Sequence, residues 1–419
     1  MQARKLLLIP SLLVLVTAIA SAGVIEKKHP DGTPRLKYEI DEKGDKDGAY
    51  EEFHPNGKAK VKAVYKGDKL EGPYKSFHEN GKPYVTAVYR DGELTGSYLE
   101  ETEQGQKKLT ATYKEGKLNG PLTHFEKGKP TLTVVYKDGE ASQKRSLPEM
   151  KKKLAEIAAS KVPGADPEMA AALNRLKAYR YLAEVPYENM ELDAELAKGT
   201  LAAAKICEKL GRLDHYPKNP GLPEAEYQLA AEGAKSSNLA QGLRQVDRCV
   251  DAWMADSDPS NIAMLGHRRW CIHPAMQKTG FGKSGIFVGM WTLDRSQSNV
   301  PDFDVVAFPP RGLMPVEYFG PEHAWSVSLN PRKFKAAPDN TSVKIIPVDT
   351  MLNKTGEPLR LNYNKPNNNP FGLPSCLIFR PDRSAVVPGR RYLVEIDGLT
   401  RTDGKPGQLS YVVEFVSLR

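Results

Sequence analysis

Two histidines in the middle of the chain are the side chains best suited to chemistry near neutral pH. His215 lies in the segment LDHYP (213–217), and His267 lies in GHRRW (266–270). Imidazole titrates close to neutral pH and is a common metal ligand, so such a pair suits acid–base catalysis, metal binding or ligand binding. Two neutral imidazoles alone would make a loose zinc site with open positions for water or a ligand.

Ser237 is a candidate nucleophile that could pair with His267. A Gly-x-Ser-x-Gly elbow does not surround it, and the sequence assigns no acid that would orient the imidazole. The sequence therefore favours a structural or ligand-binding role for the histidines over metal binding, and metal binding over catalysis. His273, in CIHP (271–274), is expected to be structural.

Helices are expected to position these residues. Apolar residues recur at helical spacing over 167–183, over 192–210 and around 246–253. Gly211 follows the second of these segments and is expected to end that helix. His215 then lies just beyond a helix end, and His267 follows the third helix.

Five segments of this region, in this order, resemble a CAP (SCP/PR-1-like) domain over about 167–300. They are LNRLKAYRYLAEVPYENMELDAELAKGTLAAAKIC (173–207), LDHYP, SNLAQG (237–242), VDAWM (250–254) and GHRRWCIHPAMQKTGFG (266–282). The resemblance implies an α-β-α sandwich with a cleft that holds two histidines and usually two acidic residues.

On this resemblance, His215 and His267 match the two histidines of the family. The family's Gly-Glu-Asn motif falls on 236–238, where the sequence is Ser-Ser-Asn, so its glutamate is missing here. The second acidic position falls near Asp251, and Glu232 lies just upstream of the motif. No catalytic residue is assigned, and His215 and His267 are the candidate metal ligands. The predicted cleft residues are His215, His267, Ser237, Asn238, Glu232, Asp251 and Arg268.

Residues 24–140 are predicted to form an array of β-hairpin repeats. Units of 24 residues begin at Gly48 and Gly72, and each holds two turn signals, such as Asn56-Gly57, separated by alternating side chains. The units resemble MORN-type repeats of the variant found in bacterial antitoxin-like proteins, which implies a β-meander that serves as a spacer or docking surface. Tyrosines that recur in step are expected to stack along the array: Tyr65, Tyr89, Tyr113 and Tyr136.

The N-terminus has the pattern of a signal peptide, residues 1–22. Arg4 and Lys5 precede an apolar run over 6–19, and an Ala-x-Ala site predicts cleavage before Gly23. The alternative is a retained membrane anchor, but the run is short for a spanning helix. We expect a secreted protein, or one in the periplasm or cell envelope, without a transmembrane anchor.

The 419 residues suggest two to three domains in a multidomain α+β protein. The repeat array is followed by a charged helical linker (141–166), the α-β-α sandwich (167–300) and a β-rich tail (301–419) expected to be an antiparallel, Ig-like sandwich with Trp325 in its core. The four cysteines could form two disulfides or remain as buried free thiols.

These features predict an exported binding protein whose cleft holds a lipid, glycan or peptide, or a cell-envelope component. The repeats would act as a spacer or bind a protein partner. The alternative is a metal-assisted hydrolase acting on extracellular or cell-envelope material, and a third hypothesis is a structural adhesion module. No cofactor is assigned, with zinc as the one candidate. The net charge of +8 is modest, and no basic helix or aromatic–basic motif suggests nucleic acid as a partner.

Overall fold

The computed structural model describes residues 22–141, 145–382 and 385–419, so the predicted signal peptide lies almost entirely outside the described residues. The chain divides into two compact units, Met1–Gly139 and Glu140–Arg419. Among the described residues, no helix is both long enough and apolar enough to cross a membrane.

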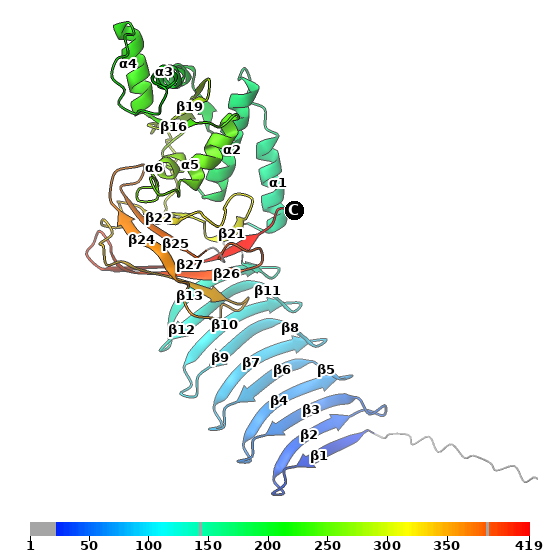
Figure 1. Ribbon diagram of the computed structural model, residues 1–419. Coiled ribbons are helices and arrows are strands. Elements are labelled where there is room, and N and C mark those ends of the chain that lie inside the picture. Colours follow the sequence, from blue (N-terminus) through cyan, green and yellow to red (C-terminus); the bar gives the residue numbers. More distant parts are fainter. Residues whose placement is uncertain (1–21, 142–144, 383–384) are drawn as a thin grey trace, which may run out of the picture. The chain divides into compact units, whose positions relative to one another are not determined.

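The first unit is an antiparallel sheet in which successive hairpins lie side by side, in the order β1-β2-β3-β4-β6-β7-β9-β10-β12-β13 (Figure 1). The short strands β5, β8 and β11 pair with β4, β7 and β10. The antiparallel array expected from the sequence is thus present. The strands are β1 (Gly23–Lys28), β2 (Pro34–Ile40), β3 (Lys46–Phe53), β4 (Ala59–Lys66), β5 (Lys69–Leu70), β6 (Gly72–Phe77), β7 (Pro83–Arg90), β8 (Glu93–Leu94), β9 (Gly96–Glu101), β10 (Lys107–Lys114), β11 (Lys117–Leu118), β12 (Gly120–Glu126) and β13 (Lys129–Lys137), and β14 (Glu140–Ala141) follows.

Side chains at equivalent positions join one unit of the array to the next. The Asn56 side-chain amide donates to the Glu79 carbonyl over 2.8 Å, and the equivalent Asn80 donates to the Glu103 carbonyl over 2.9 Å. His54 binds the carbonyl of Phe77 in the same way at 2.9 Å. These bonds account for the period of the two most similar units, because the turns at Asn56 and Asn80 are each anchored on the unit that follows.

Three of the recurring tyrosines, Tyr65, Tyr89 and Tyr113, pair with a tyrosine of the strand before them. The ring centroids of Tyr50 and Tyr65 are 5.1 Å apart, and Tyr74 and Tyr89 repeat the contact at 5.6 Å. Such offset or edge contacts are favourable between aromatic rings. The aromatic contacts therefore lie between neighbouring strands of a hairpin, which the expected stacking along the array did not anticipate.

The second unit begins with helices on both sides of a three-stranded antiparallel sheet, β16-β19-β18 (Figure 1). Helix α3 packs on β18 and β19, and α4 packs on α3, whereas α2 packs on α5. The helix predicted to stop at Gly211 does so, because that glycine adopts φ +66 as the cap of α3. The elements are α1 (Leu147–Ala158), α2 (Pro167–Leu182), β15 (Glu191–Leu192), α3 (Ala194–Leu210), α4 (Glu224–Lys235), β16 (Ser237–Gln241), α5 (Val246–Ala255), α6 (Gly266–Cys271), β17 (Lys278–Thr279), β18 (Phe281–Ser284) and β19 (Phe287–Trp291).

Glycines allow α3 to lie directly on the sheet. A methyl group at Gly282 would stand 2.2 Å from the backbone nitrogen of Leu201, and one at Gly280 would stand 2.2 Å from that of Ala197. Both distances are far inside van der Waals contact. The helix that precedes His215 is therefore seated against the sheet by the absence of side chains at these positions.

The tail forms two four-stranded sheets, β20-β22-β25-β24 and β21-β27-β26-β23. They meet around Trp325, which is fully buried and contacts Tyr392 and Phe415 of the second sheet, as expected of a core anchor. Neighbouring strands in both sheets are antiparallel, as expected, except that the additional strand β21 runs parallel to β27. The strands are β20 (Val305–Phe308), β21 (Gly312–Pro315), β22 (Trp325–Leu329), β23 (Ser342–Val348), β24 (Leu361–Asn367), β25 (Ser375–Pro381), β26 (Arg391–Thr400) and β27 (Pro406–Val416).

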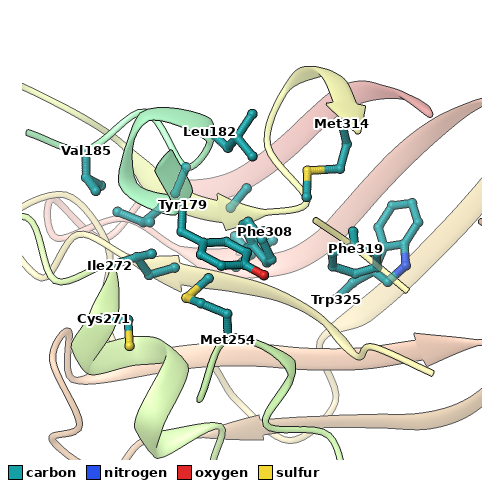
Figure 2. Close-up of a cluster of buried hydrophobic side chains, with 14 of the residues drawn as sticks. Tyr179, Leu182, Val185, Met254, Cys271, Ile272, Phe308, Met314, Phe319 and Trp325 are labelled. Atoms are coloured by element: carbon teal, nitrogen blue, oxygen red, sulfur yellow. The ribbon is translucent and has the colours of Figure 1, made fainter. Parts of the chain in front are cut away.

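The helical part and the tail share one hydrophobic core. Figure 2 shows Tyr179 of α2 beside Phe308 of β20, with Met254, Ile272 and Met314 around them, and the two ring centroids are 6.1 Å apart. The boundary predicted at residue 300 thus falls inside one compact unit. The four cysteines are all free and buried: Cys207, Cys249, Cys271 and Cys376.

Gly282→Ala should lower the free energy of unfolding by about 1 to 3 kcal/mol, because the added methyl group must displace the backbone of α3. Gly356→Ala is the matched control, since its nearest neighbour would be 3.9 Å away, and it should change stability by less than about 0.5 kcal/mol. Urea unfolding followed by circular dichroism measures both. Equal effects would contradict the close packing of α3.

Two buried histidines predict a loss of stability in acid. Burial lowers the pKa of His273 to about 4, and the charges of Arg295 and Arg180 add to the effect. Burial and the charge of Arg268 lower the pKa of His323 to about 3. Both imidazoles take up a proton more readily in the unfolded chain, where the pKa is about 6.5. Their contribution to stability is therefore complete above about pH 6.5 and is lost as the pH falls towards 4 and below.

The double variant His273→Gln/His323→Gln should show a shallower fall in unfolding free energy between pH 6.5 and 4 than the wild-type chain, by about 1 to 3 kcal/mol over the range. Urea titrations at several pH values give the two curves. The test compares the slopes of the two curves of unfolding free energy against pH. The absolute free energies are not compared, because the substitutions also change stability at neutral pH. Parallel curves would show that the histidines are not buried in their neutral form.

Candidate functional site

Both candidate histidines line one pocket of about 510 Å³, which we call the histidine pocket. His215 comes from the loop after α3, and His267 comes from the first turn of α6. The start of β16 and the loop between β24 and β25 supply other walls. The lining residues are His215, Tyr216, Lys235, Ser237, Asn238, Asn261, Met264, Gly266, His267, Trp270, Thr292, Leu293, Pro370 and Phe371.

A backbone carbonyl orients His215. Its Nδ1 lies 2.9 Å from the carbonyl oxygen of Ala234, the residue before the last of α4. A carbonyl oxygen only accepts hydrogen bonds, so Nδ1 must carry the proton that it donates. The neutral ring therefore keeps a lone pair on Nε2, which is the nitrogen available to a ligand.

A buried carboxylate orients His267. Its Nδ1 lies 2.8 Å from Oδ1 of Asp256, whose side chain is only 1% exposed. The second oxygen of the same carboxylate accepts the backbone N–H of Arg268 at 3.3 Å. The sequence had placed the acidic position near Asp251, but Asp256 is the carboxylate that contacts the histidine. The sequence feature that could have identified Asp256 is its position directly after the last residue of α5.

The backbone is strained on both sides of this contact. Asp256 and Leu265 have φ values of +41 and +46, in the left-handed region that residues other than glycine seldom adopt. Each such residue costs about 1 to 3 kcal/mol, and strain of this kind concentrates at functional sites. The two residues bound the segment that brings α6 back beside the end of α5, so the strain is linked to the Asp256–His267 contact.

Ser237 and Asn238 of β16 have different roles. Asn238 donates its side-chain amide to the His267 carbonyl at 3.0 Å, and this hydrogen bond joins β16 to α6. Ser237 is 4% exposed, and its Oγ has no hydrogen-bond partner among the described residues. A buried hydroxyl without a partner is costly unless water or a ligand reaches it. Ser237 therefore contributes a hydroxyl to the pocket wall whose oxygen is itself almost fully enclosed.

Three of the predicted cleft residues lie outside the pocket lining. Glu232 accepts a hydrogen bond from Ser236 Oγ at 3.0 Å on the exposed side of α4. Asp251 binds Arg175, on the face of α5 turned to α2. Arg268 is fully buried and donates to backbone carbonyls, and burial lowers its pKa to about 10. The structure thus brings together four of the seven predicted residues: His215, His267, Ser237 and Asn238.

The donor set is small for a resident metal. Both histidines have Nδ1 bound to an oxygen, as metal-bound histidines do. Catalytic zinc sites, however, use three protein ligands. In the part of the chain that the structure describes, no three His, Cys, Asp or Glu side chains are grouped to hold an ion. The residues present therefore do not fit a resident zinc ion.

Residues 173–286 match the family model of the cysteine-rich secretory protein family, CAP. The resemblance to a CAP domain expected from the sequence is confirmed over this range, which contains both histidines and Asp256. A search of curated proteins found no match.

Two solved structures are similar to this chain. One is an extracellular protein containing an SCP domain from Bacillus anthracis, with 11% identity, coverage of 69% of this chain and 98% of that chain, and a TM-score of 0.23. The other is a cysteine-rich secretory protein from Staphylococcus aureus, with 10% identity, coverage of 66% and 90%, and a TM-score of 0.20. At these TM-scores, the assignment of the domain rests on the family match alone.

Asp256→Asn should lower the free energy of unfolding by about 1 to 3 kcal/mol, because the amide replaces one accepting oxygen and removes the charge between His267 and Arg268. Asp339→Asn, at an exposed position, is the control and should have little effect. Denaturant unfolding measures both. If Asp256→Asn proved as stable as the wild-type chain, the buried contact would not exist in solution.

Proposed function

We propose that the chain is an exported binding protein whose CAP domain holds a ligand in the histidine pocket. One observation carries this proposal. Among the residues that the structure describes, the Nε2 atoms of His215 and His267 have no hydrogen-bond partner, and both side chains line one pocket whose surface is mostly apolar. Ligand sites commonly combine a few such polar groups with mostly apolar surroundings, in volumes of about 300 to 1,000 Å³.

The lining indicates the charge of the ligand. Lys235 and the two histidines are present, whereas none of the described residues that line the pocket is an aspartate or glutamate. A cationic ligand would find no carboxylate partner among these residues. A carboxylate would find the ammonium of Lys235, whereas a hydroxyl or N–H of a sugar or peptide could donate to the Nε2 lone pairs of the two histidines. We therefore propose a ligand with a polar or anionic head and an apolar body, within the range of lipids, glycans and peptides.

The signal-peptide pattern supports export, and the array of hairpins in the first unit supports a role as a spacer or docking surface. Both remain parts of the proposal. Export places the pocket outside the cytoplasm, where the ligand would be a cell-envelope or extracellular molecule.

A hydrolase is the second candidate function. It is favoured by the hydrogen bond between Asp256 and His267, because a carboxylate that orients an imidazole leaves Nε2 ready to act as a general base. Ser237 contributes a buried hydroxyl to the wall of the same pocket. Hydrolysis of a nitrophenyl ester by the wild-type chain, lost in His267→Ala and kept in His29→Ala, would support this function over simple binding.

The proposed binding can be tested with anilinonaphthalene sulfonate, an anionic aromatic dye whose fluorescence rises on burial. The double variant His215→Ala/His267→Ala should bind the dye at least about tenfold more weakly than the wild-type chain, because the pocket loses both imidazole rings and with them the Nε2 acceptors for the anilino N–H of the dye. His29→Ala, in the first unit, is the matched control and should bind like the wild-type chain.

The single variant His215→Ala guards against unfolding, because His215 is exposed and contributes little to the core. It should retain the wild-type melting temperature and still lose affinity. Equal affinities in all four proteins would show that the dye does not bind through the histidine pocket.

A further inference from the structure

We infer that the loop between β24 and β25, which we call the 368–374 loop, forms the specificity wall of the histidine pocket, with Phe371 selecting ligands that carry a flat ring. The inference rests on the proposed function and adds a chemical class to it. It also assigns a binding role to the β-rich tail, since Pro370 and Phe371 line the pocket beside His215 and His267.

Phe371 lies directly against the start of α6. A methyl group at Gly266 would meet ring atoms of Phe371 at 3.6 Å, an ordinary van der Waals distance, so the ring lies beside the first residue of α6. His267 is the next residue along the chain. The ring is thus placed within one residue of a polar group of the pocket, and it remains half-buried, with part of its surface open to a ligand.

Arg269 holds the 368–374 loop in place. This arginine is 2% exposed and lies on α6, two residues after His267. Its guanidinium donates to Asn367 Oδ1 at 2.8 Å, to the Asn369 carbonyl at 2.5 Å and to the Leu373 carbonyl at 2.7 Å. It also lies 5.5 Å from the centre of the Phe371 ring. Two bonds to the loop and one to Asn367, the last residue of β24, fix the distance of the loop from α6, so Arg269 is a positioning residue for Phe371.

Other contacts make the loop rigid before any ligand arrives. Asn367 donates its side-chain amide to the Ala263 carbonyl at 2.9 Å, which ties the loop to the segment before α6. Gly372 adopts φ +62, and a methyl group there would lie 2.5 Å from the Arg269 carbonyl oxygen. The loop therefore passes too close to α6 for any side chain at this position. A wall that is already ordered costs little entropy on binding, which favours selectivity by shape.

The chemical class follows from the aromatic side chains of the lining. Trp270 of α6 and Phe371 are both half-buried and both line the histidine pocket. Aromatic rings stack on flat partners and gain about 0.5 to 1.5 kcal/mol beyond simple burial. Together with Lys235 and the absence of acidic residues among the described lining, the pocket fits an anionic ligand that carries a flat ring.

The test compares two anions of different shape, anilinonaphthalene sulfonate and decanoate, on the full chain. Phe371→Leu keeps an apolar side chain and removes the flat face. It should raise the Kd of the aromatic dye by about three- to tenfold and change the Kd of decanoate by less than about twofold. Tyr363→Leu, on β24 and outside the pocket lining, is the control and should leave both values unchanged.

Each outcome decides a different point. If Phe371→Leu weakened both ligands equally, or neither, while His215→Ala still weakened binding, the specificity wall would be refuted and the proposed function would stand. If the wild-type chain bound neither anion, the proposed function itself would fail and the inference with it. Phe371→Ala, which also removes the apolar bulk, should weaken both ligands, with the larger loss for the dye. Thermal unfolding of each variant confirms that the comparison is made between folded proteins.

Discussion

Two neighbouring guanidinium groups on helix α6 determine how the second unit is assembled. Arg268 donates to the carbonyls at the end of α5 and to the Ala324 carbonyl beside β22, whereas Arg269 donates to the 368–374 loop. Placing a charge in the interior costs several kcal/mol unless its donors are satisfied, and the negative end of the α5 dipole favours Arg268. Helix α6 is therefore held at a fixed distance from the end of α5 and from the sheet β20-β22-β25-β24. His267 precedes Arg268 on the same turn of α6, so its position is fixed by the same hydrogen bonds.

Much of this arrangement follows from local patterns in the sequence. Helical spacing and Gly211 predicted α3, and a run of separate segments pointed to the CAP domain and to His215 and His267. Asp256 was missed because it acts from a left-handed backbone conformation after α5, which side-chain periodicity does not reveal. Phe371 was missed for another reason. It reaches the pocket only through contacts between segments far apart in the chain.

The change in composition near residue 300 marks a change in secondary structure and not an end of the core. Helical periodicity gives way to strand alternation there, so the sequence suggested a boundary. Yet Tyr179 of α2 packs on Phe308 of β20, and buried side chains continue from one part into the other. Composition reports how the backbone is folded locally. Which surfaces are buried against each other depends on the shapes of side chains throughout the unit, and a local change in composition does not reveal it.

The bonds that join the hairpins of the first unit have an evolutionary consequence. Asn56 and Asn80 make the same contact one unit apart, and each unit presents to the next the surface that it receives from the one before. Duplication of a full-period segment that carries this asparagine would therefore create one more junction of the same chemistry. An insertion of any other length would break the junction at which it falls. Where the asparagine recurs, the array can be lengthened only in whole periods.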